Sequence, residues 1–249
     1  GVITPKQVAE AFGNELILLL MGGFMMAAAL ERNNAHRRLA LGMVRLFGGH
    51  SGRHLLWGFV FATAVASMWI SNTAATLMML PVAMAVLEDY QDQRLRVPLV
   101  LGIAYAASIG GWGTPIGTPP NLVFMQAYEQ ATGTRMGFLE WMRFGVPIML
   151  IFLPLLALWL GRHLREAPAA SVPQLGPWQT GEQRVLMVFA LIVAAWIFRS
   201  EPYGGWSALA GLPAVSDASI ALVGVLLMAI VPDGRGSALI DWPTAERVP

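Results

Sequence analysis

The part of this sequence that most constrains the fold is residues 55–87, a long run without a charged side chain. A straight helix of this length would measure about 50 Å, whereas the hydrocarbon layer of a membrane is roughly 30 Å thick. If the run is divided at Ser71, Asn72 and Thr73, each arm measures about 22 Å, which reaches the middle of a bilayer without crossing it. The run therefore predicts a re-entrant helical hairpin with a polar tip.

The tip of such a hairpin is a candidate ion site. The last carbonyls of the first arm and the first N–H groups of the second lack helical partners, and in lipid they must be buried in protein or bind a ligand. Carbonyl oxygens suit a cation, and a helix N-terminus suits an anion. Ser71, Asn72 and Thr73 add hydroxyl and amide groups, and Ser67 lies on the same helical face as Ser71. Helix packing or a simple N-cap is the alternative role.

The composition places the chain among integral membrane proteins, because 56% of its residues are hydrophobic and only 12% are charged. The net charge is +1 and the arginines are scattered, so no nucleic acid partner is expected. The chain has no cysteine, and its four histidines show no metal-ligand spacing. Ser67 and Ser71 have no His or Lys at membrane depth to activate their hydroxyls, so we do not expect an enzyme.

A second uncharged run, residues 97–128, is interrupted at its centre by GGWGTPIGTPPN, residues 110–121. A continuous helix does not pass through this content of glycine and proline. Each flank is too short to cross a bilayer alone. The run therefore predicts a discontinuous helix whose unwound middle lines a site, with an extramembrane loop as the alternative.

The remaining apolar runs predict four conventional spanning helices, at residues 15–30, 141–160, 185–198 and 218–231. With the broken helix they make five crossings, and the hairpin adds none. On this topology twelve arginines face the cytoplasm and four basic residues face outside, in agreement with the positive-inside rule. The fold class expected is an all-α polytopic membrane protein.

The chain order then predicts four segments. The first holds a lead-in with a short surface helix at residues 1–13, the first span, and an amphipathic helix at residues 31–46 that lies in the interface or in the cytoplasm. The sequence of residues 3–13 weakly resembles that of residues 240–249, which predicts that an inverted second repeat starts near the end of this chain. The segments are 1–54, 55–87 with the hairpin, 88–165 with the broken helix and the next span, and 166–249 with a linker and two spans.

Three stretches of the sequence resemble one transporter family. They are LLLMGGFMMAAALERNNAHRRLAL at 18–41, WISNTAATLMMLP at 69–81 and AYAASIGGWGTPIGTPPN at 104–121. Together they look like the divalent anion:sodium symporter family, which carries dicarboxylates, citrate and sulfate. The similarity runs nearly end to end, and the pairing of SNT with GTPPN about 45 residues later makes it specific.

The resemblance implies the roles of individual residues. In that family two inverted repeats each present a hairpin and a broken helix, with a sodium ion near each tip and an anion between two SNT motifs. It implies sodium at Ser67, Ser71, Asn72 and Gly117, substrate at Asn72, Thr73, Thr118 and Pro119, and an unwound loop shaped by Gly113, Pro120 and Asn121. No second SNT occurs here, so a second repeat of the same protein would supply the other half of the substrate site.

The function implied is Na+-coupled symport of small di- or tricarboxylates, such as succinate or citrate, across the inner (plasma) membrane by a protein that is a homodimer at full length. A related ion carrier, for sulfate, arsenite or cation/proton exchange, is the alternative. An exchanger would need a carboxyl group within the membrane, and neither the hairpin nor the broken helix holds one. A structural fragment that transports nothing is a further alternative.

Cysteine labelling tests the hairpin. Because both flanks of residues 55–87 are expected to face the cytoplasm, single cysteines introduced at Gly49 and Gln93 should react from the same side of the membrane. This part of the protein has no cysteine of its own to interfere. Labelling from opposite sides would show that the run crosses the membrane and that there is no re-entrant hairpin.

Overall fold

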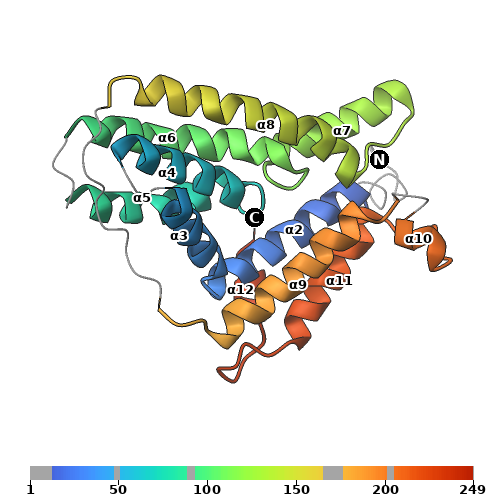
Figure 1. The fold of residues 1–249 in the computed structure, drawn as a ribbon. Coiled ribbons are helices and arrows are strands. Elements are labelled where there is room, and N and C mark those ends of the chain that lie inside the picture. Colours follow the sequence, from blue (N-terminus) through green and yellow to red (C-terminus); the bar gives the residue numbers. More distant parts are fainter. Residues whose placement is uncertain (1–12, 48–50, 89–92, 165–175, 201–204, 249) are drawn as a thin grey trace, which may run out of the picture. The chain divides into compact units, whose positions relative to one another are not determined.

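The computed structural model describes residues 13–47, 51–88, 93–164, 176–200 and 205–248 (Figure 1). These residues form helices and connecting turns, with one isolated bridge between Pro232 and Ala238 in place of any strand. The all-α fold class is therefore confirmed. Residues 1–12 of the lead-in and most of the linker at 167–180 lie outside the described residues.

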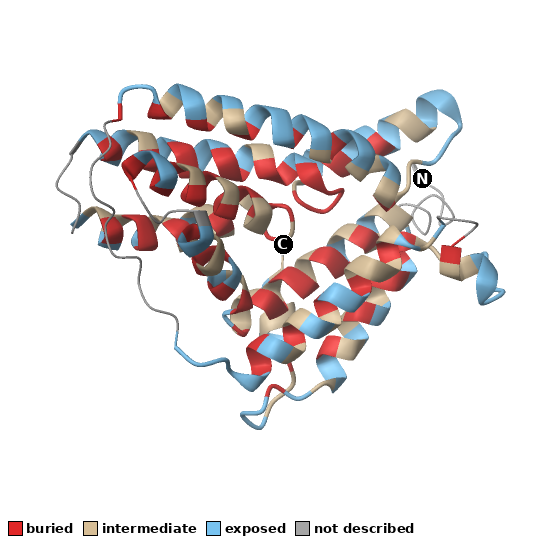
Figure 2. Cartoon of the chain, viewed as in Figure 1, coloured by how far each residue is buried: buried red, intermediate tan, exposed pale blue. Residues whose placement is uncertain are grey.

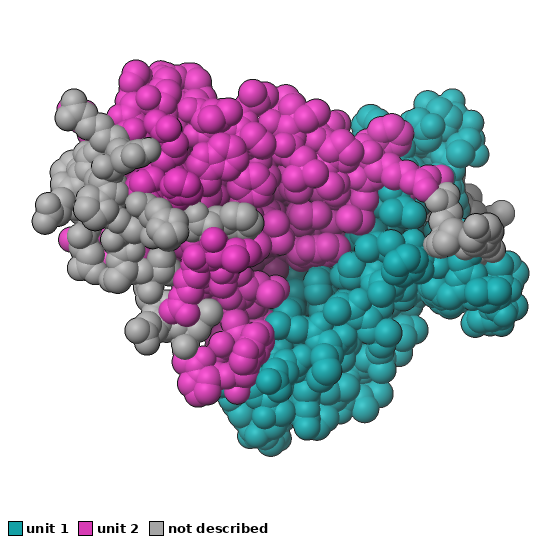
Figure 3. Space-filling view, in the orientation of Figure 1, with its two compact units in different colours: residues 1–33, 122–139, 179–249 teal, residues 34–121, 140–178 magenta. Residues whose placement is uncertain are grey.

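The chain divides into two compact units, which Figure 3 shows in different colours. Unit 1 comprises residues 1–33, 122–139 and 179–249, and unit 2 comprises residues 34–121 and 140–178. The predicted hairpin and the unwound part of the predicted broken helix both belong to unit 2. The four-segment division by chain order remains a prediction.

Unit 1 contains three long helices that pack together, α2 (Glu15–Arg32), α9 (Thr180–Ile197) and α11 (Asp217–Ile230), with two short ones, α10 (Gly205–Leu209) and α12 (Trp242–Ala245). Small residues allow α2 and α11 to cross closely. A Cβ atom at Gly22 would lie only 2.7 Å from the Cβ atom of Ala221. Such small residues are typical of contacts between membrane helices.

A partly buried ion pair fixes the start of α11 within unit 1. Asp217 Oδ1 lies 2.8 Å from Arg199 Nε, and Asp217 Oδ2 accepts a hydrogen bond of 2.9 Å from the backbone N–H of Phe138. The Trp196 indole N–H donates to the Asp217 carbonyl, and its ring stacks on Phe138. These contacts join the end of α9, the start of α8 (Phe138–Gly161) and the start of α11.

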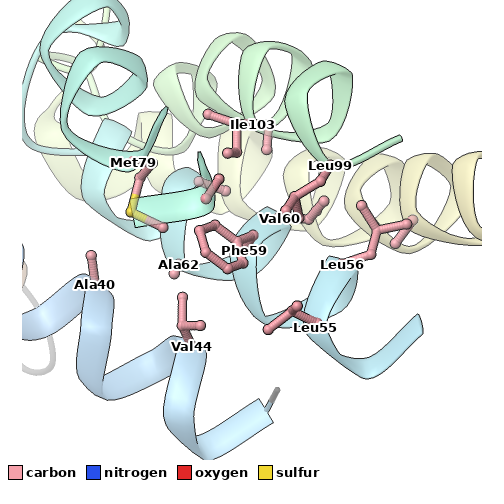
Figure 4. Packing of buried hydrophobic residues seen from close by; sticks show 14 of the residues in the cluster. Ala40, Val44, Leu55, Leu56, Phe59, Val60, Ala62, Met79, Leu99 and Ile103 are labelled. Atoms are coloured by element: carbon pink, nitrogen blue, oxygen red, sulfur yellow. The ribbon is translucent and has the colours of Figure 1, made fainter. Parts of the chain in front are cut away.

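Unit 2 is organised around α4 (Gly52–Ser67), which packs against α3 (Ala35–Phe47) and α6 (Arg96–Gly110). The second hairpin arm, α5 (Asn72–Glu88), packs against α4 and α6. The core between these helices is apolar. Figure 4 shows Phe59 and Val60 of α4 between Val44 of α3 and Ile103 of α6, all fully buried.

The helix expected at residues 31–46 differs in its start. α2 continues to Arg32, and α3 begins at Ala35 after a short turn. Asn34 lies in the turn with φ +56, a left-handed conformation that Asn tolerates better than most residues and that cannot continue a helix. α3 is amphipathic as expected, because Ala40 and Val44 are buried on one face while Arg37 is exposed.

The two arms of the predicted hairpin are present as α4 and α5, but the break lies at residues 68–71 and not at 71–73. Ser71 causes this difference. Its hydroxyl accepts a hydrogen bond from the N–H of Ala74 at 3.1 Å, and its carbonyl accepts one from Ala75 at 2.9 Å. Ser71 is therefore the N-cap of α5, and Asn72 lies in the first turn of this helix.

Among the described residues, two helices, α8 and α9, are long and apolar enough to cross a membrane, and α5 and α11 are shorter apolar helices. α11, expected as a span at 218–231, has 14 residues, which corresponds to about 21 Å. Figure 2 shows exposed residues along much of α8, and they include the large side chains of Phe144, Ile151 and Trp159. Exposed apolar groups of this kind suit contact with lipid.

The crossing of α4 and α6 predicts a matched pair of glycine variants. A Cβ atom at Gly110 would lie 2.5 Å from Ala64 Cα, within the backbone of α4. Gly110→Ala should therefore lower the free energy of unfolding by about 1–3 kcal/mol. A Cβ atom added at Gly42 of α3 would meet no other atom within 4 Å. Gly42→Ala should therefore leave the free energy of unfolding unchanged or raise it by up to about 1 kcal/mol. The measurement is the unfolding midpoint in detergent, and equal midpoints for the two variants would contradict this packing.

Candidate functional site

Ser67 is the last residue of α4 and is fully buried. Its hydroxyl oxygen lies 2.7 Å from Asn72 Oδ1 and 2.7 Å from the Ala107 carbonyl oxygen of α6. A hydroxyl carries one proton, so it donates to only one of these oxygens at a time. The Ala107 carbonyl also accepts the backbone N–H of Gly111, the C-cap of α6, so Asn72 Oδ1 is the oxygen left without this proton when Ser67 donates to Ala107.

The first residues of α5 lie closer to the surface of unit 2. Asn72 is half-buried, whereas Ser71 and Thr73 are exposed. The first turn of a helix carries the positive end of the helix dipole, which favours a negative group. The tip thus presents neutral oxygens on its buried side and a helix N-terminus on its outer side.

The predicted broken helix is interrupted where the sequence indicates. α6 ends at Gly110, a short 3-10 turn, η2 (Gly111–Gly113), follows, and α7 (Pro119–Thr132) begins after residues 114–118. The buried Asn121 side chain holds this segment together, because its Nδ2 donates to the carbonyls of Gly111 at 2.7 Å and Thr114 at 2.8 Å. Backbone groups that a continuous helix would satisfy are satisfied here by a side chain.

The two breaks in the helices contact each other. The buried Thr114 hydroxyl, in the unwound segment, donates a hydrogen bond to the Met68 carbonyl, in the break between α4 and α5. A Cβ atom at Gly113 would lie 2.8 Å from Met68 Cγ. The two irregular segments therefore form a hydrogen bond with each other and pack against one another.

Two further glycines allow the polar groups to approach closely. A Cβ atom at Gly111 would lie 2.7 Å from Asn72 Oδ1 and 3.3 Å from Thr118 Cβ. A Cβ atom at Gly117 would lie 2.5 Å from the carbonyl oxygen of Gly111. The absence of a side chain at Gly111 lets Asn72 and Thr118 approach its backbone, and the absence of one at Gly117 lets the Gly111 carbonyl lie against it.

The structure thus gathers part of the predicted site residues around one point. Asn72, Gly117 and Thr118 lie beside Gly111, and Ser67 contacts Asn72. Gly113 and Asn121 hold the unwound segment, residues 111–118, next to them. The other residues lie further out, on the exposed first turns of α5 and α7: Ser71, Thr73, Pro119 and Pro120.

Sequence reasoning missed three residues that build this point, namely Ala107, Gly111 and Thr114. Gly111 and Thr114 lie inside the GGWGTPIGTPPN motif, and the pair of adjacent glycines was a local signal for a close approach. Ala107 acts through its backbone carbonyl, so its side chain gives no signal.

The chemistry available at this point is that of neutral oxygen and amide groups. Unwound backbone and neutral side-chain oxygens are the ligands that transporters use for Na+. Among the residues that the structure describes, no group of three or more His, Asp or Glu side chains could hold a metal ion.

Comparisons with known proteins identify related transporters. The sequence model of a family described as citrate transporter matches residues 1–244. The sodium-dependent dicarboxylate transporter SdcS of Staphylococcus aureus strain USA300 is 34% identical over 100% of the chain and 52% of its own length. The same transporter from strains N315 and bovine RF122 matches at the same identity and coverage. The chain thus spans about half the length of these curated relatives.

Proposed function

The chain belongs to the citrate transporter family, and from this premise we propose that it forms part of a sodium-coupled carrier of small di- or tricarboxylates. Its matched relatives are transporters and not enzymes, and it is accordingly a multi-pass protein of the inner membrane. Within the carrier, this chain supplies one sodium site and half of the anion site. A second repeat of the same protein supplies the other half, and the full-length protein works as a homodimer.

The observation that carries the sodium proposal is the gathering of three oxygen atoms around Ser67. Its hydroxyl has two acceptors, Asn72 Oδ1 and the Ala107 carbonyl, each at 2.7 Å, and only one proton to offer. The Ala107 carbonyl also accepts the N–H of Gly111, so a bound sodium ion would chiefly satisfy Asn72 Oδ1 and the Ser67 oxygen. Ser71 and the backbone at Gly117 would complete the ligands from the two neighbouring breaks.

The anion proposal depends on the outer side of the tip. Asn72 has an amide donor besides its acceptor oxygen, and Thr73 and Thr118 have hydroxyl donors at or near the surface of unit 2. The N-terminus of α5 favours negative charge at the same place. The carboxylate of a substrate would bind here while sodium occupies the buried side, so that each charge compensates the other. Pro119 would border this anion site, and Pro120 would shape the loop behind it.

The alternatives make different demands on the site. Sulfate or arsenite would use the same hydrogen-bond donors as a dicarboxylate. The site would therefore distinguish these anions by how well they fit and not by the type of residue that binds them. A cation/proton exchanger would need a titratable carboxyl group at the ion site, and residues 55–87 and 97–128 contain no Asp or Glu. The buried Asp217 of unit 1 is paired with Arg199 at 2.8 Å. The exchanger is therefore disfavoured.

Uptake into proteoliposomes tests this function. The full-length protein should accumulate radiolabelled succinate or citrate when sodium is outside and should not do so when choline replaces sodium. Competition with sulfate and arsenite in the same assay separates the alternative carriers. Equal uptake in sodium and choline would contradict coupling, and the absence of uptake of every anion would contradict the carrier. The structural fragment is distinguished by whether sodium changes the stability of this chain.

Asn72 gives a sharper test of the site. Asn72→Asp should abolish dicarboxylate uptake, because the new carboxylate repels the substrate even while it attracts sodium. Asn34→Asp is the matched control, since Asn34 is exposed and Asp also tolerates its left-handed backbone conformation. The control should transport as the wild type does. Unchanged uptake by Asn72→Asp would remove Asn72 from the anion site.

A further inference from the structure

Trp112, the middle residue of η2, is held by a residue of α8. The indole N–H of Trp141 donates a hydrogen bond of 2.8 Å to the Trp112 backbone carbonyl. This carbonyl belongs to the unwound segment, where the regular helical partner of a carbonyl is lost. A side chain from another helix therefore fixes the orientation of this peptide group.

Gly145 of α8 approaches the same carbonyl. A Cβ atom at Gly145 would overlap the Trp112 carbonyl oxygen and would lie 3.1 Å from Trp141 Nε1. Because the atom in the way is backbone, no rotation of a side chain could relieve the overlap. The backbone of α8 thus touches the unwound segment directly, and only glycine permits it.

A third contact involves the ring of Trp112. It meets the ring of Phe152 edge to face, with 5.8 Å between the centroids. Residues 141, 145 and 152 are spaced by four and seven positions, so they lie along one face of α8. Three residues of one helical face therefore contact one residue of the unwound segment.

The neighbours of Trp112 show why this contact matters for the site. Gly111 lies against Asn72 and Thr118, and Gly113 lies against Met68. Two glycines in three residues make this turn costly to order, because glycine loses the most conformational freedom. Fixing Trp112 between them limits the positions that the two glycines can take.

We propose that Trp141 and Gly145 are positioning residues that hold the Trp112 peptide and thereby set the affinity of the ion site at Ser67, Asn72 and Gly117. This inference rests on the proposed function. Neither residue touches sodium, and each acts through the backbone of η2. α8 is then a support for the site besides being an apolar helix long enough to span a membrane.

The variant Trp141→Phe isolates the hydrogen bond, because it keeps an aromatic ring and removes the N–H donor. Trp141→Phe should raise, about two- to tenfold, the sodium concentration that gives half of the maximal stabilisation of the protein. This range corresponds to the net free energy of one hydrogen bond. Gly145→Ala should raise this concentration at least as much, since it displaces the Trp112 carbonyl.

Two residues of the same helix serve as controls. Trp159 is 60% exposed and its ring lies under the Arg162 guanidinium, so Trp159→Phe should leave the sodium dependence unchanged. Gly161 has ordinary space for a Cβ atom, with the nearest atom at 3.5 Å, so Gly161→Ala should also behave as the wild type does. Neither control touches the unwound segment.

The measurement is the thermal unfolding midpoint of the full-length protein in detergent across a sodium titration, with choline keeping the ionic strength constant. A ligand that binds only the folded state raises this midpoint with its concentration, which gives an apparent affinity without any transport. The expected result is a sodium titration shifted to higher concentration in Trp141→Phe and Gly145→Ala, and unshifted in both controls.

Two other results have separate meanings. If Trp141→Phe lowers the midpoint in choline but titrates with sodium as the wild type does, the contact is only packing and the positioning role is wrong. If sodium stabilises the wild type no more than choline does, the proposed sodium site fails, and the positioning role fails with it. Trp141→Phe keeps the test decisive even where Gly145→Ala does not fold.

Discussion

The constraint on which this structure depends is that every polar backbone group at membrane depth needs a partner inside the protein. Unit 2 contains two interruptions of its helices, at residues 68–71 and 111–118, and each exposes such groups. The interruptions satisfy one another through the Thr114 hydroxyl and the Met68 carbonyl, while Asn121 binds two carbonyls within the second. A single interruption would leave polar backbone groups without partners, whereas the two interruptions here supply partners to each other.

The proposed site follows from that pairing. Once the interruptions meet, Gly111 leaves room for Asn72 and Thr118, and Gly117 leaves room for the Gly111 carbonyl. The Ser67 hydroxyl has two acceptors for its proton. The result is a group of neutral oxygens next to a helix N-terminus, which suits a cation and an anion in adjacent places. The contacts of α8 with Trp112 would then hold the less regular of the two segments in position.

Local composition was enough to predict the main elements. The uncharged run with SNT predicted two helical arms, and the glycines and prolines of GGWGTPIGTPPN predicted the broken helix. The exact start of α5 was missed, because Ser71 caps the helix and draws Asn72 into its first turn. The Ala107 carbonyl and the Trp141 donor were not predictable either, since contacts over 40 and 29 residues leave no pattern in the neighbouring sequence.

The central claim is that sodium organises the two interruptions and so prepares the anion site. Its most direct test is the affinity of the full-length protein for a dicarboxylate in detergent across a sodium titration, with choline as the replacement ion. Because coupling between two ligands is reciprocal and is typically about 1–3 kcal/mol, sodium should tighten anion binding roughly five- to 150-fold. Hydrogen exchange at residues 67–75 and 113–121 should slow in parallel. An anion affinity that is the same in sodium and choline, with unchanged exchange at these amides, would contradict the account.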